Sequence, residues 1–94
     1  MEMTMQVTLP PLKYDHPYPG SVIERVLPLE ETRKLCTAIG VGQVDGCAGY
    51  VTMSDGTKAC FVVLPVDGPD PNIENYRRHE IAHCNGWPAS HRDE

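Results

Sequence analysis

The sequence contains no long apolar run and no surplus of positive charge, and both absences narrow the kind of protein it encodes. No segment approaches the roughly 18 consecutive apolar residues from which a membrane-spanning helix is built. The formal net charge is −5, whereas proteins that bind nucleic acid along its phosphates usually carry a basic face. We therefore expect neither a membrane nor a nucleic acid as a partner.

Cys-x-x-Cys pairs are also missing, although the chain has four cysteines: Cys36, Cys47, Cys60 and Cys84. Their spacing does not suit a zinc site made of four thiolates. In a short exported chain, four cysteines would form two disulfides in one of three pairings. The first five residues, however, lack the basic stretch and apolar core of a secretion signal. We therefore expect a cytoplasmic protein with reduced cysteines.

A chain of 94 residues makes one domain at the small end of the usual range. So short a chain buries a limited core, and a bound metal would add a large share of its stability. Residues 1–20 are rich in proline and are expected to form an extended arm that lies across the body. Residues 21–94 are expected to form the single domain. His16, within the arm, is interpreted as a surface residue.

The domain is predicted to begin with a strand and a helix. Residues 21–27 place Val, Ile and Leu around a central Glu-Arg pair, a pattern typical of a strand. Residues 29–39 follow Pro28 and are acidic first and basic later, which favours a helix, and Gly40 ends it. Its packing face is expected to consist of three apolar residues: Leu35, Ala38 and Ile39.

A β-hairpin is the clearest prediction for the middle of the chain. Asp55-Gly56 separates two β-prone runs, residues 47–54 and 57–64. Asp-Gly is a pair that the two-residue type I′ turn favours. In that register Tyr50 would lie opposite Phe61.

The last predicted helix covers residues 71–85. Asp70 is suited to its N-cap, and Gly86 to the left-handed residue that stops it. Glu74 would pair with Arg78 one turn later on an outward face. The side of this helix that faces the core is predicted to consist of Ile73, Ile81 and Cys84.

Residues 79–83 of this helix read His-Glu-Ile-Ala-His, the pattern H-E-x-x-H. His79 and His83 would lie about 40° apart around the helix axis and about 6 Å apart along it. Both imidazoles can then bind one metal ion at the roughly 2.0–2.1 Å that zinc prefers. Glu80 is rotated about 100° from His79, and is suited instead to accept a proton from a water on that metal. The pattern predicts a hydrolytic zinc site.

A hydrolytic zinc site takes a third protein ligand and leaves a position open for water. His91 is the expected third ligand, because it follows the turn at residues 86–88 with enough chain to fold back. Asp93 is the alternative and would give a site of two histidines and one carboxylate. Trp87 is expected to pack beneath the turn. Tyr76, about 60° around the helix from His79, is a candidate to donate to an oxyanion or orient a ligand, or else packs.

The order strand, helix, hairpin and H-E-x-x-H helix resembles the N-terminal half of the zincin metallopeptidases, over roughly residues 21–91. Residues 79–86 also match the longer H-E-x-x-H-x-x-G of the metzincin branch. The chain departs from that branch because Ala89 stands where its third histidine is expected and no methionine follows Met53. The chain is also similar to short bacterial and phage proteins that share H-E-x-x-H-C-N-G-W.

This resemblance implies an α+β protein with a small sheet and hairpin, a backing helix and a C-terminal H-E-x-x-H helix, a truncated zincin-like fold. The expected activity is zinc-dependent hydrolysis of a peptide or protein, with Glu80 as general base and Tyr76 as a candidate assistant. The alternative is a non-catalytic zinc module for interaction or inhibition. In that module the metal would only fasten the C-terminal segment to the body.

Overall fold

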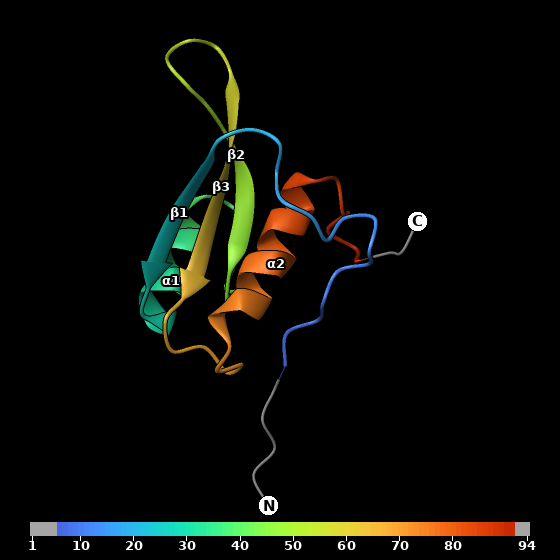
Figure 1. The fold of residues 1–94 in the computed structure, drawn as a ribbon. Coiled ribbons are helices and arrows are strands. Elements are labelled where there is room, and N and C mark those ends of the chain that lie inside the picture. Colours follow the sequence, from blue (N-terminus) through green and yellow to red (C-terminus); the bar gives the residue numbers. More distant parts are fainter. Residues whose placement is uncertain (1–5, 92–94) are drawn as a thin grey trace, which may run out of the picture.

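The computed structural model describes residues 6–91, which form a three-stranded mixed sheet and two helices (Figure 1). The elements follow the order β1 (Val22–Leu27), α1 (Leu29–Ala38), β2 (Cys47–Thr52), β3 (Lys58–Pro65) and α2 (Ile73–Cys84). β3 lies in the middle of the sheet, parallel to β1 and antiparallel to β2. The predicted α+β class is confirmed. No helix within residues 6–91 is long and apolar enough to cross a bilayer.

The two helices cover opposite faces of β3, because successive side chains of a strand point to opposite sides of the sheet. Val62 and Leu64 pack in one buried cluster with Tyr76 of α2. Val63 packs in a second cluster with Cys36 of α1. The central strand is therefore buried on both faces, which explains why its sequence is a nearly continuous apolar run.

Helix α1 packs against the sheet with a face that differs from the predicted one. Its buried residues are Thr32 and Cys36, whereas Ala38 is exposed and Ile39 is 47 % exposed. The Thr32 hydroxyl donates to a carbonyl of β1 at 3.2 Å, so a polar residue is satisfied inside the core. Leu35 packs against a core cluster, as predicted. The prediction was wrong for Ala38 and Ile39, and it missed Thr32 because it counted only apolar side chains as packing residues.

The predicted hairpin is present, but its register is shifted by one residue. Tyr50 lies opposite Cys60 rather than opposite the next residue. Across the turn Met53 pairs with Thr57, which leaves residues 54–56 as the loop. Only the glycine of this loop has a positive φ, +86°. A three-residue loop with a left-handed glycine therefore replaces the predicted type I′ turn, in which both central residues need a positive φ.

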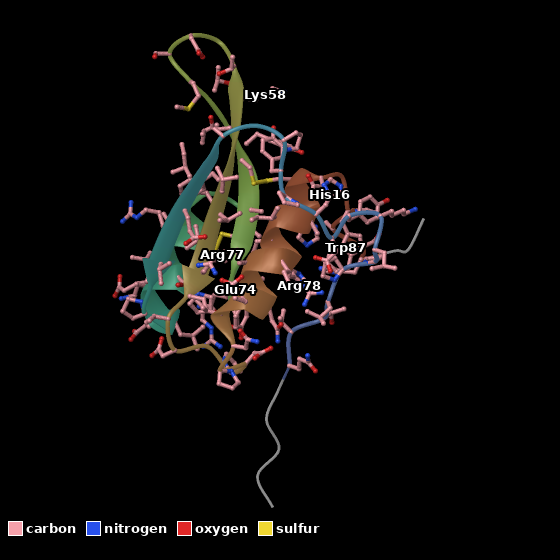
Figure 2. The ribbon with its side chains drawn as sticks, in the orientation of Figure 1. His16, Lys58, Glu74, Arg77, Arg78 and Trp87 are labelled. Carbon is pink, nitrogen blue, oxygen red and sulfur yellow. A yellow bond between two sulfur atoms is a disulfide. The ribbon has the colours of Figure 1, made fainter. Side chains whose placement is uncertain are left out.

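The prediction of reduced cysteines is wrong, because all four cysteines form disulfides. Cys36–Cys47 joins α1 to the start of β2, and Cys60–Cys84 joins β3 to the end of α2; sulfur is yellow in Figure 2. The partners are 11 and 24 residues apart and meet only when the elements pack. Disulfides persist in oxidising compartments and are rare in the cytosol, which speaks against the expected cytoplasmic location.

Replacing both Cys60 and Cys84 by serine is expected to lower the free energy of unfolding by about 3 kcal/mol. The reason is that the disulfide restrains the unfolded chain between residues 24 positions apart. Urea denaturation of the metal-free protein measures the loss. The matched variant, Cys36→Ser with Cys47→Ser, removes a shorter closed loop and should lose slightly less. An unchanged midpoint in the first variant would show that this pairing does not stabilise the fold.

Residues 6–20 of the N-terminal arm lie along α2 (Figure 1). Arg78 of α2 binds Asp15 of the arm, with 2.5 Å between Nη2 and Oδ2. At the end of the helix, the side-chain nitrogen of Asn85 donates to the carbonyls of Tyr14, at 3.0 Å, and His16, at 2.6 Å. The arm is therefore fastened to the helix that carries the histidines.

The charged face of α2 is paired differently from the prediction. Arg78 does not pair with Glu74 but with the arm, and Glu74 pairs with Arg77. Arg77 also binds Glu24 of β1, with 2.7 Å between Nε and Oε1; Figure 2 labels Glu74, Arg77 and Arg78. Arg77 is thus held by carboxylates on both its own helix and a strand.

Candidate metal centre

Helix α2 begins two residues later than predicted. Its N-cap is Asn72, whose side-chain oxygen accepts from the amide of Glu74 at 3.1 Å. The predicted cap, Asp70, instead accepts from the amide of Asn72 at 2.9 Å, and this local turn delays the helix. At the other end Gly86 has φ +104° and turns the chain back, as predicted.

Three histidines meet at the C-terminal half of α2. His79 and His83 lie one turn apart, and His91 returns from the turn that follows, so that the ligand atoms of all three lie within 4.8 Å of one another. Nε2 of His79 is 3.3 Å from Nε2 of His83 and 3.2 Å from Nε2 of His91. Two zinc ligands at tetrahedral positions, about 2.0–2.1 Å from the ion, would lie about 3.3–3.4 Å apart. Two of the three pairs of predicted ligands, His79 with His83 and His79 with His91, thus have the spacing of tetrahedral ligands, and the third pair lies within 4.8 Å.

Backbone carbonyls orient two of the imidazoles. Nδ1 of His79 lies 2.6 Å from the carbonyl oxygen of Thr8, and Nδ1 of His83 lies 2.8 Å from that of Trp87. A carbonyl oxygen can only accept, so each Nδ1 carries the proton and each Nε2 turns a lone pair to the centre. Burial lowers the pKa of both His79 and His83. Both imidazoles are therefore held in the neutral form that binds metals.

The side chain of Trp87 is 3 % exposed and contacts all three imidazoles. It stacks on His83 with 4.9 Å between ring centroids and meets His79 and His91 at 4.9 and 4.8 Å. The prediction that this residue packs beneath the turn is confirmed. His91 itself has φ 60°, an uncommon conformation for a residue with a side chain, and such conformations cluster at functional sites.

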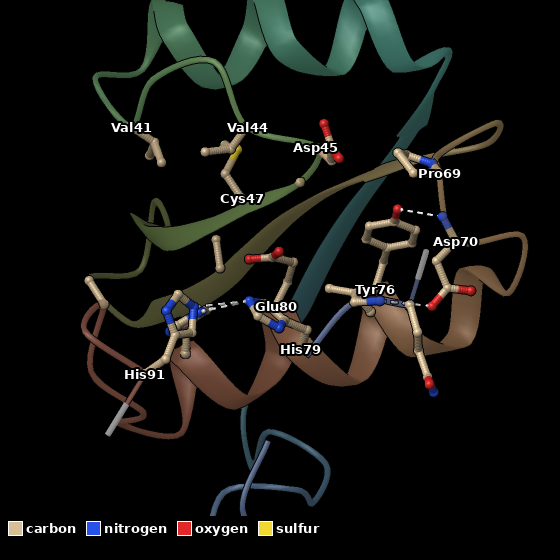
Figure 3. A pocket seen from close by; sticks show the side chains of 16 residues that line it. Val41, Val44, Asp45, Cys47, Pro69, Asp70, Tyr76, His79, Glu80 and His91 are labelled. Atoms are coloured by element: carbon tan, nitrogen blue, oxygen red, sulfur yellow. Dashed lines mark hydrogen bonds between the residues drawn. The ribbon is translucent and has the colours of Figure 1, made fainter. Parts of the chain in front are cut away.

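Glu80 lines the same pocket as the three histidines (Figure 3). It is 5 % exposed, and burial raises the pKa of its carboxyl group to about 8. Within residues 6–91 no ion pair joins it to a cation. A carboxyl group with such a pKa changes protonation state near neutral pH, which suits a group that transfers protons.

Tyr76, the other residue predicted to assist catalysis, lines the same pocket as the histidines, but its hydroxyl group is held by the backbone before α2. Its hydroxyl oxygen accepts from the backbone amide of Asp70 at 3.0 Å and points toward Pro69 in Figure 3. Its ring belongs to the buried cluster with Val62 and Leu64. Burial also raises the pKa of its hydroxyl. This geometry is that of a packing residue and gives no support to a role at an oxyanion.

Two further candidates from the sequence do not add to the site. His16 is exposed in the arm, with Nδ1 3.0 Å from the carbonyl oxygen of Pro17, and is outside the histidine group. Asp93, the alternative third ligand, lies outside the described residues.

The pocket has a volume of about 530 Å³ and lies between α2 and the loop that leads into β2 (Figure 3). Its histidines and Glu80 form a polar side, and Val41 and Val44 stand on the opposite side. Sequence reasoning missed this apolar wall and also the carbonyl of Thr8. The sequence feature that could have indicated the wall is the pair Cys36 and Cys47 on either side of a glycine-rich loop, because a disulfide between them fixes that loop.

The resemblance to zincins rests on the motif in residues 79–86 and on the order of the elements. No family model matches the chain, and no curated protein or solved structure matches it either.

Proposed function

We propose that this chain is a zinc-dependent hydrolase with a truncated zincin-like fold, acting on a peptide or protein. The observation that carries the proposal is the convergence of three histidines in a pocket that a buried carboxyl group, that of Glu80, also lines. His79, His83 and His91 would hold the ion and leave one tetrahedral position for water or substrate. Bound zinc would polarise the scissile carbonyl and make a water more acidic.

The proposed role of Glu80 is proton transfer. The helix places this residue directly after His79, and its carboxyl group lines the pocket that the histidines share. In its ionised form it accepts a proton from the attacking water and then donates that proton to the leaving amine. A cation nearby lowers the pKa of a carboxyl group, so the ionised form is available at neutral pH.

An extended substrate has a strand edge to pair with. β2 is at the edge of the sheet, and on its outer side no strand within residues 6–91 pairs with it. Ala48 of this strand lines the pocket. A peptide added to this edge would gain main-chain hydrogen bonds while one of its bonds approaches the histidines.

The alternative function is a structural zinc module, and the small size of the chain favours it. In such a module the three histidines would fasten the segment around His91 to α2. Structural zinc sites usually close with four protein ligands, whereas the group within residues 6–91 has three. A structural site also has no need of a buried carboxyl group in its pocket, so Glu80 supports hydrolysis.

The proposal is tested by incubating zinc-loaded protein with a mixture of unstructured peptides and detecting new termini by mass spectrometry. Cleavage should stop with a chelator and return with added zinc. The His91→Ala variant should lose most of the cleavage, because a proposed ligand is gone. Stoichiometric zinc binding without new termini across the mixture would favour the structural module.

Asp70→Ala is expected to weaken zinc binding about tenfold. Loss of a group that orients a metal ligand by hydrogen bonding typically lowers the metal affinity roughly 10–100-fold. One carboxylate oxygen of Asp70 accepts from the amide of Val7 at 3.0 Å and thereby positions the neighbouring carbonyl of Thr8 on His79. Competition with a zinc-binding dye measures the affinity. Asp67→Ala is the control, since Asp67 lies in the same loop but accepts from the amide of Leu29. Equal affinities in both variants would contradict this role of the arm.

A further inference from the structure

The loop between α1 and β2 forms the side of the pocket that faces the histidines. Val41 and Val44 stand on it, across the pocket from His91 and Glu80 (Figure 3). Ala48 and Ala89 add further apolar surface to the lining. No lysine or arginine is among the described residues that line this pocket.

Two of the three carboxylates in the lining are already occupied. Asp45 accepts from Arg33, with 3.0 Å to Nε and 2.9 Å to Nη2. Asp70 accepts from the amide of Val7 and from the side chain of Asn75, each at 3.0 Å. Apart from the proposed metal, the described lining therefore presents no cationic side chain to an anionic group, and its one remaining carboxylate is Glu80, which follows the proposed ligand His79 in sequence.

The loop is held in place before any ligand arrives. The Cys36–Cys47 disulfide closes it at its two ends, and the Val41 amide donates to the carbonyl of Cys36 at 2.9 Å. Gly40 and Gly42 supply the positive φ angles, +92° and +121°, that the chain needs on either side of Val41. Val44 packs against the core cluster that contains the disulfide. The wall is therefore a preformed surface.

We propose that this wall accepts an uncharged apolar side chain of the substrate, adjacent to the bond that is cleaved, and that Val41 and Val44 determine this specificity. The inference rests on the proposed function, since it takes the histidines as the metal site. An apolar group against the valines gains by leaving water. A carboxylate against the valines would lose hydration without gaining a lysine or arginine as a partner.

Cobalt-loaded protein and three hydroxamates of equal chain length provide the test, because a hydroxamate binds the metal and its tail reaches along the pocket. The tails end in a methyl, a carboxylate or an ammonium group, and binding is followed by the visible absorption of cobalt. The methyl probe should bind at least about tenfold more tightly than the carboxylate probe. A tenfold difference in affinity corresponds to the free energy gained by burying about two methylene groups.

Val41→Asp should weaken the methyl probe about tenfold, since it places a charge on the wall. Val66→Asp is the matched control, because Val66 is 63 % exposed and is not part of the pocket lining. Equal affinities of the methyl and carboxylate probes for the wild type, or a preference for carboxylate, would overturn the role of the wall while leaving the metal site intact. Absence of cobalt uptake would overturn the proposed function and this inference with it.

Discussion

Replacing Glu80 by glutamine is expected to stabilise the metal-free protein at pH 9 and to abolish hydrolysis by the zinc-loaded protein. Burial raises the pKa of this carboxyl group from 4.5 to about 8. Between these two pH values the folded chain binds more protons than the unfolded chain, so stability falls as pH rises through this window. Above about pH 8 the loss is complete, and the difference in pKa sets its upper limit at about 5 kcal/mol.

Glutamine carries no charge at any of these pH values, so the variant escapes this loss. We expect a gain of a few kcal/mol at pH 9 and almost none at pH 4.5, measured by urea denaturation with a chelator present. Glu74→Gln is the matched control, because Glu74 lies on the same helix with its side chain 62 % exposed. If Glu80→Gln gave the same gain at both pH values, ionisation of the buried carboxyl group would not be the cause.

The same substitution removes the proposed proton acceptor, because an amide nitrogen or oxygen does not take the proton of the attacking water. Zinc content should remain, since Glu80 is not among the three residues whose ligand atoms converge. A variant that is more stable, still binds zinc and no longer cleaves peptides would separate a catalytic role for Glu80 from a structural one. Loss of zinc in this variant would instead show that Glu80 is a ligand.

Zinc is expected to stabilise the wild-type protein by about 4 kcal/mol when free zinc exceeds the dissociation constant about a thousandfold. In a domain of 94 residues this corresponds to a rise in Tm of roughly 20 °C. His91→Ala should remove most of the gain, whereas His16→Ala, which removes an exposed histidine of the arm, should keep it. Melting curves with zinc and with chelator provide the measurement. Identical responses of wild type and His91→Ala would show that His91 is not a ligand.

The gain from zinc should fade in acid. Burial lowers the pKa of His79 and His83 from 6.5, so the unfolded chain takes up these protons at a higher pH than the folded chain. The neutral imidazoles therefore contribute to the stability of the folded protein above pH 6.5. This contribution is lost as pH falls toward the pKa values that the two histidines have in the folded protein. Protons also compete with zinc for the same nitrogens, and we expect the difference between zinc and chelator to shrink below about pH 6.

The parts of this site that depend on neighbouring residues can be predicted from the sequence. The spacing of His79 and His83 sets them on one helix face, and Gly86 is at the position where the chain must turn back. These features depend on residues that are close in sequence, so helix periodicity and turn chemistry suffice to predict them. The place of His91 follows from the same turn.

The parts of the fold and of the site that depend on contacts between distant residues cannot be predicted from the sequence. Cys60 and Cys84 pair only because β3 and α2 pack together, and the burial that shifts the pKa of Glu80 comes from the whole pocket. The contact of Thr8 with His79 joins residues 71 positions apart through a backbone carbonyl, which no side-chain pattern can indicate. The hairpin register failed for a smaller reason, since Asp55-Gly56 suits a three-residue loop as well as a two-residue turn.

Whether the three histidines bind zinc is tested most directly by the metal content of the untagged protein, purified without chelators and measured by inductively coupled plasma mass spectrometry. Three converging histidines, with Nε2 of His79 at tetrahedral spacing from Nε2 of each of the other two, predict about one zinc per chain and the loss of most of it in His79→Ala. Less than roughly a tenth of an equivalent in the wild type, unchanged after dialysis against zinc, would contradict the account.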